Sequence, residues 1–237
     1  MVIDSRSIAD TLADIRLEKD VQAEVHRFAR SLGFDTYTLG YINPSVSERA
    51  FFIDNHPDAS FDIPDIATRD PVLARLKGEP IPFSWDRSFY VDAKCEDIWE
   101  AGSHVGISAG LIAPVRPGGD RRMVISLDRD QPLDGTREQI ADQLGRLDKF
   151  TRLLSGTVVS LFDSLSQLEN SLSSAEKEVL RWTYAGLSSL ELARRLRPHK
   201  GYDFVQQTLK SAAMKMGTTD PMTASILAAR AGVLGQI

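Results

Sequence analysis

The sequence predicts a protein of the α+β class, with an N-terminal α-β-α sandwich around an antiparallel sheet and an all-α C-terminal bundle. Strand-like runs of alternating apolar residues occur only before residue 130. After Thr136 the sequence has helical periodicity alone, first in one long segment and then in short segments that begin with capping residues. With 237 residues, the chain is long enough for two domains of ordinary size.

The first half of the chain begins with a helix over residues 5–33, where apolar residues fall on one stripe and Gly33 ends the pattern. Pro117 to Asp120 is expected to form the turn between two strands of a hairpin. Strands are expected at 36–42, 51–53, 108–115 and 122–127, and short helices at 71–76 and 93–101. This order of elements favours an antiparallel sheet covered by helices.

A long amphipathic helix is expected over residues 136–168. Its seam positions recur with 4-3 spacing, and all but the fourth are apolar: Ile140, Leu144, Leu147, Thr151, Leu154, Val158, Leu161, Leu165 and Leu168. Such a seam is typical of a coiled coil, and equally of a helix packed on the sheet of its own domain. We expect the first half to pack on the sheet and the second half to pair with another subunit, so that residues 140–168 form a homodimer.

A stretch rich in Ser and Asn follows this helix and contains the interdomain linker, expected at residues 164–172. The linker separates an N-terminal domain of residues 1–163 from a C-terminal domain of residues 173–237. We expect the N-terminal domain to hold the long helix and the sheet, and the C-terminal domain to hold the short helices.

The C-terminal domain reads as a helix-turn-helix bundle. Ser173 with Glu176, and Ser188 with Glu191, form two capping boxes, in which the serine and glutamate side chains satisfy backbone N–H groups at a helix start. A third helix follows from a cap at Asp203. A generic small helical bundle is the alternative interpretation, because capping boxes are common.

The third helix presents polar residues opposite its apolar stripe, and double-stranded DNA is the expected partner of this face. The candidates for contact with base edges or phosphates are Lys200, Gln206, Gln207, Lys210, Ser211 and Lys215. From Ser171 onward the chain carries 9 Lys and Arg residues against 5 Asp and Glu residues, while the remainder carries 19 against 28. A net positive charge after Ser171 and a net negative charge before it are typical of a protein that contacts DNA only through its C-terminal domain.

Composition excludes several other classes of protein. Hydrophobic residues make up 42% and charged residues 26% of the chain, values typical of a soluble globular protein. No apolar run reaches the roughly 18 residues of a membrane span, the N-terminus lacks a signal-peptide pattern, and one cysteine, Cys95, fits a reducing compartment. We therefore expect a cytoplasmic protein without a membrane partner. Without a phosphate loop, metal-ligand spacing or nucleophile–base motif, we expect no enzyme activity, no cofactor and no metal.

The tail resembles a known family. The segment from Leu172 to Ala193 is similar to the C-terminal DNA-binding domain of LuxR-type quorum-sensing regulators, which carries Leu-Thr-x-Arg-Glu, Val-Leu, Ala-x-Gly and Glu-Ile-Ala in that order. Glu176, Leu180 and Gly186 fall on its most characteristic positions. Residues 220–234 resemble the fourth helix of that domain. The resemblance covers roughly the last 65 residues.

The N-terminal half carries motifs of the same family. Asp70-Pro-Val and the Pro-Phe-x-Trp run that ends at Trp85 have the separation found in its sensor domain, and Gly110 lies in a matching Gly-Ile-x-x-Gly-x-x-x-Pro-Val run. From the residues alone, Asp70 is explained by a cap before Pro71 and Trp85 by a place in the core. The resemblance implies a pocket for an N-acyl-homoserine lactone. In this pocket Asp70 accepts a hydrogen bond from the amide N–H of the ligand, and the Trp85 side chain packs against the lactone ring. The ligand-binding residues that it implies are Asp70, Trp85, His56, Phe61, Gly110 and Ser126.

The sequence also departs from the family. His56 stands where the family has its first tyrosine, Phe61 stands near the second, and the tryptophan that donates to the lactone carbonyl has no counterpart, with Ser60 nearest by spacing. These changes leave open a different lactone, another amide ligand or no ligand. The turn before the third tail helix is longer and its helix has fewer cations, which predicts a shallower salt dependence of DNA binding.

Two functions therefore follow from the sequence. The leading hypothesis is a dimeric, ligand-responsive transcription regulator in quorum sensing, with an N-acyl-homoserine lactone as its small-molecule ligand. The alternative is a related dimerisation module that binds another ligand or none, and that sequesters a second regulator while binding DNA weakly itself. A DNA-binding assay separates the two.

Overall fold

The computed structural model describes residues 18–45, 50–56, 66–196, 201–230 and 233–234. Its contacts divide the chain into two compact units, Met1–Phe162 and Asp163–Ile237. The first unit combines helices with an antiparallel sheet, as predicted, and the second contains helices. Within the described ranges, no helix is long and apolar enough to cross a membrane.

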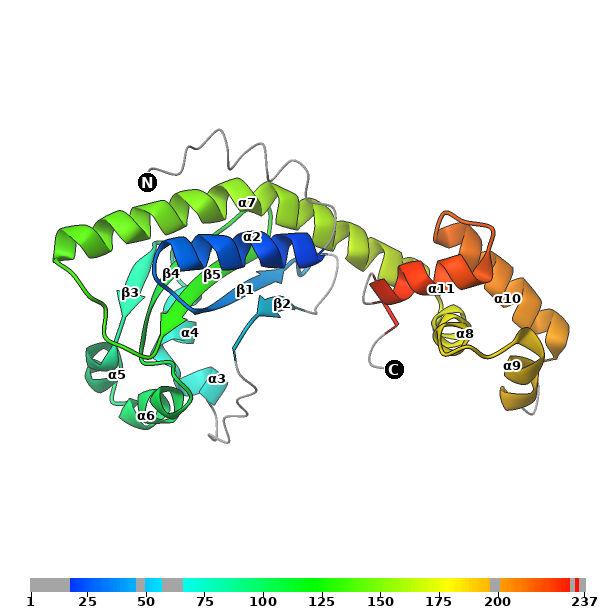
Figure 1. Ribbon diagram of the computed structural model, residues 1–237, viewed down its shortest axis with the longest axis horizontal. Helices are drawn as coiled ribbons and strands as arrows, with labels where there is room; N and C mark the ends of the chain where they lie inside the picture. The colour runs from blue at the N-terminus through cyan, green and yellow to red at the C-terminus, as the bar shows by residue number, and fades with distance from the viewer. Residues whose placement is uncertain (1–17, 46–49, 57–65, 197–200, 231–232, 235–237) are drawn as a thin grey trace. The chain divides into compact units, whose positions relative to one another are not determined.

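The first unit is built on a five-stranded antiparallel sheet with the strand order β2-β1-β5-β4-β3 (Figure 1). The strands are β1 (Thr36–Ile42), β2 (Phe51–Asp54), β3 (Phe83–Trp85), β4 (Ala109–Val115) and β5 (Arg122–Arg129). Four of them were predicted, and the β4–β5 hairpin turns at Gly118 and Gly119, which both have positive φ. The edge strand β3 was not predicted, because three residues are too few to show an alternating pattern.

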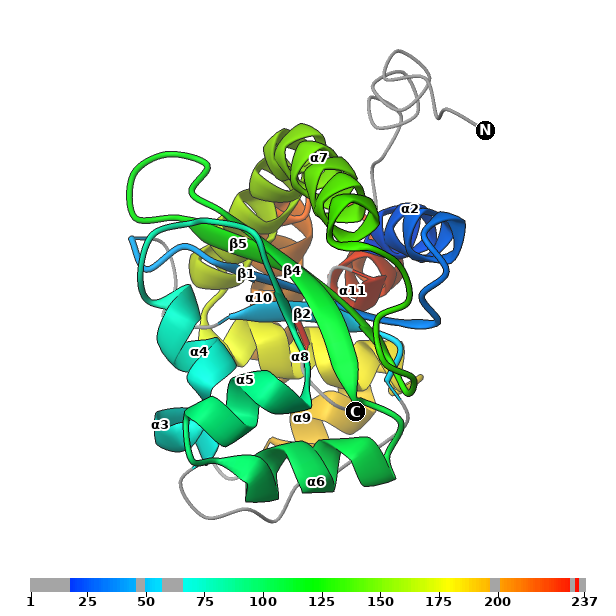
Figure 2. The ribbon, with the colours of Figure 1, turned by 90° about the vertical axis from the view of Figure 1, so that its left-hand side faces the viewer.

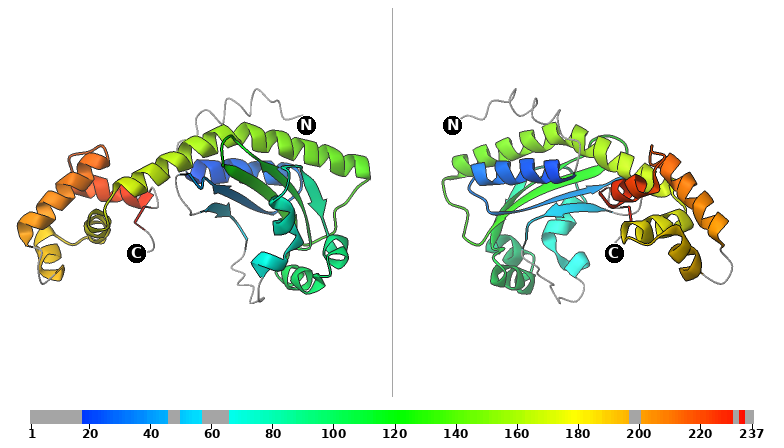
Figure 3. Two further views of the ribbon diagram at one scale, coloured as in Figure 1. Left: turned by 180° about the vertical axis from the view of Figure 1, so that it is seen from behind. Right: turned by 45° about the vertical axis from the view of Figure 1, so that its right-hand side comes forward.

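Helices cover both faces of this sheet, which confirms the sandwich (Figures 2 and 3). On one face lie α2 (Glu18–Ser31) and the part of α7 (Arg137–Ser171) that belongs to the first unit. On the other lie α3 (Ile66–Arg69), α4 (Pro71–Leu76), α5 (Arg87–Asp92) and α6 (Glu96–His104). Residues 5–17 of the predicted first helix lie outside the described ranges.

Aromatic stacking joins α7 to the rest of the first unit. Phe150 stacks on Phe28 of α2 with ring centroids 4.0 Å apart, and Phe162 stacks on Phe51 of β2 at 4.7 Å. Four central seam positions are fully buried: Leu147, Thr151, Leu154 and Val158. Thr151 fits this apolar seam because its hydroxyl donates to the carbonyl of Leu147 at 2.8 Å. We predicted that only the first half of the helix packs on the chain's own sheet, but the buried seam continues to Val158, and Phe162 beyond it also packs in the first unit.

The helix predicted at 93–101 differs from the observed helices. Ala93 is the C-cap of α5, Lys94 has φ = 57°, and α6 begins only at Glu96. Two short helices therefore replace one, because a left-handed residue interrupts helical hydrogen bonding. Asp86 starts α5 by accepting a hydrogen bond from the backbone of Ser88 at 2.8 Å.

The second unit contains α8 (Ser174–Tyr184), α9 (Ser189–Arg195), α10 (Tyr202–Lys215) and α11 (Pro221–Arg230) (Figure 1). Both predicted capping boxes are present, at Ser173 and at Ser188. Gly186 closes α8 with φ = 89°, a conformation that favours glycine. The expected cap at Asp203 is wrong: Gly201 is the N-cap of α10, and Asp203 lies in the first turn. Residues 164–171 of the expected linker form the end of α7.

A single apolar cluster holds the second unit together. Its members come from all four helices and from the chain just before α8 and after α11. They include Leu172, Val179, Leu180, Leu192, Val205, Leu209, Ala212, Ala224, Ala228 and Leu234. The predicted stripe of α10 lies in this cluster through Val205, Leu209 and Ala212, while Met216 packs at its margin.

Candidate functional site

A cavity of about 180 Å³ lies between the sheet and α3, α4, α5 and α6. The helices supply Ile66, Val72, Tyr90, Ile98, Trp99 and Gly102, the loop before α4 supplies Asp70, and the loop before β4 supplies Ile107. The strands supply Trp85, Ile112, Ser126 and Asp128. The cavity therefore combines apolar walls with a few polar side chains, which is the usual composition of a small-molecule site.

Asp70 enters the cavity from the start of α4. Its Oδ1 accepts a hydrogen bond from the backbone N–H of Val72 at 2.8 Å and lies 3.4 Å from the hydroxyl of Tyr90. Asp70 is thus the N-cap of α4, as its residue type before Pro71 suggested, and it also lines the cavity. Burial raises the pKa of Asp70 above its ordinary value, although the hydrogen bonds from Val72, Leu73 and Tyr90 lower it. A further donor from a ligand would favour the charged form of this carboxylate.

Trp85 and Gly110 face each other across the β3–β4 pair. The Trp85 side chain is buried and meets Tyr90 edge to face, with ring centroids 5.7 Å apart. A Cβ added to Gly110 would lie 2.6 Å from Nε1 of Trp85 and 2.6 Å from Oδ1 of Asp128. Glycine is therefore required at position 110, because the polar atoms of the cavity lie directly over its backbone.

Ser126 and Asp128 lie on the same face of β5, two residues apart, and both line the cavity. The Ser126 hydroxyl donates to Oδ1 of Asp128 at 2.7 Å, and Nε2 of His56 lies 3.2 Å from Oδ2 of Asp128. The hydrogen bond to Asp128 raises the pKa of His56 above its ordinary value, against the lowering effect of burial. His56, which follows β2, thus acts on the cavity through Asp128.

The structure brings most of the predicted ligand-binding residues together. Asp70, Trp85 and Ser126 line the cavity, Gly110 lies under its polar atoms, and His56 contacts Asp128. Phe61 lies outside the described residues. Sequence reasoning missed Tyr90 and Asp128. The alternation of side chains along a strand would have placed Asp128 on the same sheet face as Ser126. No sequence pattern indicated Tyr90, because its helix, α5, was not predicted.

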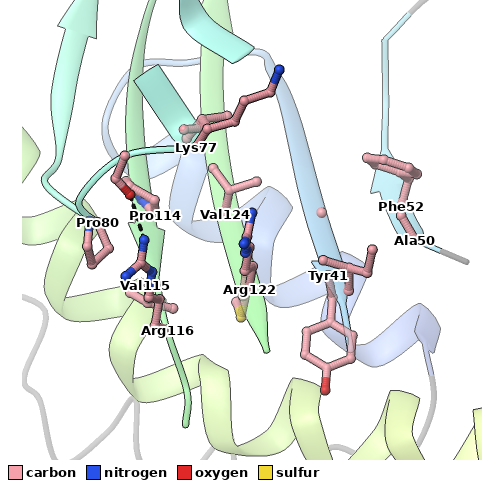
Figure 4. A pocket seen from close by; sticks show the side chains of 15 residues that line it. Tyr41, Ala50, Phe52, Lys77, Pro80, Pro114, Val115, Arg116, Arg122 and Val124 are labelled. Carbon is pink, nitrogen blue, oxygen red and sulfur yellow. Dashed lines mark hydrogen bonds between the residues drawn. The ribbon is translucent and has the colours of Figure 1, made fainter. Parts of the chain in front are cut away.

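An apolar groove of about 220 Å³ lies along the same strands, nearer the β4–β5 turn (Figure 4). Val124 of β5, Pro114 of β4 and Phe52 of β2 line it together with Pro80. Arg116 borders the groove and donates to the carbonyl of Gly78 at 2.8 Å. The groove and the cavity thus follow one face of the sheet, and the carboxylates of Asp70 and Asp128 lie in the cavity.

The predicted DNA-contact residues lie on α10, except Lys200, which is outside the described residues. Gln206, Gln207 and Lys210 are exposed. Gln206 donates from Nε2 to the hydroxyl of Tyr202 at 3.0 Å. Tyr202 and Met214 of the same helix are also exposed, so its surface is not uniformly polar.

Ser211 and Lys215 hold a buried carboxylate of α8. Ser211 donates to Oε1 of Glu176 at 2.7 Å, and Nζ of Lys215 lies 2.8 Å from Oε2. Oε2 also accepts the backbone N–H of Ser173, and Lys215 reaches the carbonyl of Ser171 at 2.8 Å. Burial opposes ionisation of Glu176, but these hydrogen bonds outweigh it and lower its pKa to about 2. Both predicted DNA contacts therefore have a partner within the unit.

Among the described residues, no group of His, Cys, Asp and Glu side chains is arranged to hold a metal ion. The cavity instead offers hydrogen-bond partners for an organic ligand: two carboxylates, two hydroxyls and an indole N–H.

Residues 18–154 match the family described as the autoinducer binding domain, and that match spans more than half of the chain. The chain therefore belongs to this family, the sensor-domain family of LuxR-type quorum-sensing regulators. A curated relative is the transcriptional activator protein AnoR of Acinetobacter nosocomialis, which is 24% identical over 227 residues, covering 93% of this chain and 94% of AnoR.

Two solved structures have the same fold. The crystal structure of Escherichia coli SdiA in space group P6522 covers 98% of this chain and 98% of its own, with a TM-score of 0.57 at 21% identity. SdiA in complex with octanoyl-rac-glycerol covers 98% and 96%, with a TM-score of 0.56 at 20% identity.

Proposed function

We propose that this protein is a dimeric, ligand-responsive regulator that binds DNA in quorum sensing. Membership of the autoinducer-binding family is the observation that carries the proposal, and the cavity around Asp70 and Trp85 supports a small-molecule ligand. A ligand that binds only the folded sensor stabilises it by about 2.7 kcal/mol at a hundredfold excess over the dissociation constant. Residues 1–163 are the proposed sensor and dimerisation domain, 164–172 the linker and 173–237 the DNA-binding domain.

The proposed ligand is an acylated amide, with the N-acyl-homoserine lactones of the family as the first class to test. Its amide N–H would donate to Asp70, whose pKa is raised by burial, and its acyl chain would occupy apolar surface. The test is thermal unfolding of the full chain with a panel of acylated amides and esters of one chain length. A rise in Tm with any of them supports ligand sensing; an unchanged Tm with all of them contradicts it.

Substitution of Asp70 is expected to weaken ligand binding by about 1.5–3 kcal/mol, the range for a hydrogen bond to a charged group. Because Asp70 also caps α4, Asp70→Ser is the sharper variant: serine keeps a capping oxygen but loses the carboxylate. Asp70→Ser should melt near the wild-type temperature without ligand and bind more weakly in calorimetry. Equal affinity of wild type and Asp70→Ser would remove Asp70 from the binding site.

Sequence-specific DNA binding is tested by selection from a random pool of duplexes, with and without ligand, followed by titration at several salt concentrations. Gln207→Ala should relax the sequence preference, because glutamine can read adenine through two hydrogen bonds. Lys210→Ala should weaken binding to all sequences alike, because a phosphate contact carries no sequence information. A pool without an enriched sequence in either condition would reject specific recognition.

Dimerisation is proposed through residues 140–168. Because the central seam positions are buried in the chain's own unit, the partly exposed Leu161 is the position to change. Leu161→Asp should shift the mass measured by light scattering from dimer to monomer while the circular dichroism spectrum is retained. A wild-type protein that is monomeric at tens of micromolar would contradict the dimer.

The alternative function is a dimerisation module that sequesters another regulator and binds DNA weakly. The engagement of Ser211 and Lys215 by Glu176 favours it, because these two side chains are then less available to DNA. The exposed Tyr202 and Met214 on α10 favour a protein partner over phosphates. Failure of the DNA selection, together with a retained dimer, would support this alternative.

A further inference from the structure

The cavity contains a second buried carboxylate besides Asp70. Asp128 is only 4% exposed, and both of its oxygens already face partners, Ser126 at 2.7 Å and His56 at 3.2 Å. Those partners fix the position of the carboxylate on the cavity wall. Each carboxylate oxygen has more than one lone pair, so Oδ1 can accept a second hydrogen bond besides that of Ser126.

A buried donor lies beside this carboxylate without a partner. Nε1 of Trp85 makes no hydrogen bond within the described part of the chain, although the residue is only 6% exposed. Nε1 of Trp85 and Oδ1 of Asp128 both lie 2.6 Å from the Cβ position of Gly110, so an unpaired donor and a carboxylate oxygen border the same point of the strand. An unpaired buried N–H is costly, so the cavity is prepared for a group that completes this pair.

The chemistry of the pair selects the group that fits. A hydroxyl accepts from the indole N–H of Trp85 and donates to the carboxylate of Asp128 at once. A lactone or ester oxygen only accepts, so it would turn its lone pairs toward the carboxylate. An ammonium group only donates and would leave the indole N–H unpaired.

We infer that the ligand of this cavity carries a hydroxyl group on its polar head, which binds between Trp85 and Asp128 while a second donor of the head reaches Asp70. This inference rests on the proposed ligand-sensing function and specifies its ligand as an acylated amino alcohol or a related amphiphile, in place of a lactone. It assigns Asp128 as the residue that determines head-group specificity and His56 as the residue that positions Asp128.

The acyl part of such a ligand has a place on the same sheet face. Along β5, Val124 lines the apolar groove (Figure 4), whereas Ser126 and Asp128 contribute polar groups to the cavity. Along β4, Pro114 and Ile112 follow the same order. An amphiphile aligned with these strands would therefore place its chain toward Val124 and its head toward Asp128.

The inference is tested with three ligands that share an octanoyl amide and differ only in the head. N-octanoylethanolamine has a hydroxyl, N-(2-methoxyethyl)octanamide has an ether oxygen at the same position, and N-octanoyl-homoserine lactone has a lactone. Calorimetry with the full-length protein should give at least about tenfold tighter binding for the alcohol than for the ether or lactone, which corresponds to one hydrogen bond to a charged group. This comparison needs no variant and cannot be affected by misfolding.

The variant Asp128→Asn then tests whether Asp128 determines the preference for a hydroxyl head group. The amide of asparagine can donate to an ether or lactone oxygen, so this variant should lose the preference for the alcohol or reverse it. Equal binding of alcohol and ether by the wild type, or an unchanged preference in Asp128→Asn, would overturn the inference. If only amphiphiles without a hydroxyl on the head raise the Tm, the head-group inference is wrong but the proposed ligand sensing is supported. If no amphiphile raises it, both fall.

Discussion

Glu176→Gln is expected to lower the opening free energy of α8 and α10 by about 2–3 kcal/mol at neutral pH. The carboxylate of Glu176 is 5% exposed and receives hydrogen bonds from Ser211, Lys215 and the backbone of Ser173. Glutamine keeps the shape but removes the charge; its carbonyl oxygen can still accept from Lys215 and Ser173, while its NH2 group replaces the acceptor of the Ser211 hydroxyl with a donor. Amide hydrogen exchange in the full-length protein measures this opening helix by helix.

The pH dependence of the effect has a definite sign. The pKa of Glu176 falls from 4.5 in the unfolded chain to about 2 in the folded unit, so its stabilisation is fully present above pH 4.5 and disappears as the pH falls toward 2. The difference between wild type and Glu176→Gln should therefore shrink over that window. Glu191→Gln is the matched control, since Glu191 forms the other capping box but is exposed. The fall in opening free energy should therefore be smaller for Glu191→Gln than for Glu176→Gln. Equal losses for both variants would show that Glu176 contributes only as a cap.

Glu176 also shows how far sequence reasoning reaches. Its capping box with Ser173 is a local pattern that spans four residues, and it was predicted correctly. Its bonds to Ser211 and Lys215 join residues 35 and 39 positions apart in the sequence, and no periodicity indicates them. The sequence therefore predicts that the polar face of α10 is available to DNA, whereas two of its residues, although exposed, are engaged by the buried carboxylate of Glu176.

The same distinction holds in the sensor unit. The bounds of β1 and α4 agree with the prediction, because strand alternation and the Asp70-Pro71 start are local signals. The cavity residues known from family motifs, Asp70 and Trp85, do lie together. The role of Asp128 depends on His56 reaching it from the end of a different strand, which only the folded sheet brings about. The sequence therefore predicts the layers and part of the pocket, but not its second carboxylate.

Gly110→Ala is expected to destabilise the sensor unit by about 1–3 kcal/mol, the range for overpacking a well-filled interior. The added Cβ would lie 2.7 Å from the backbone carbonyl of Leu127, besides its close approach to Trp85 and Asp128. The carbonyl belongs to the paired strand β5 and cannot withdraw without distorting the β4–β5 ladder. Alanine would otherwise stabilise a strand relative to glycine, so a loss of stability isolates the steric conflict.

Gly40→Ala provides the matched control on the same face of the same sheet. There the new Cβ would meet only side chains, Phe52 and Val124, each at 3.3 Å, and Phe52 is 62% exposed and free to turn. Urea unfolding of both variants should therefore show a marked loss for Gly110→Ala and little change for Gly40→Ala. Gly110→Ala should also lose ligand binding, because its methyl group would displace Nε1 of Trp85 and Oδ1 of Asp128, the two atoms proposed to hold the head group. If Gly110→Ala were as stable as Gly40→Ala and bound ligand normally, the arrangement of polar atoms over Gly110 would be wrong, and with it the basis for a hydroxyl-bearing ligand.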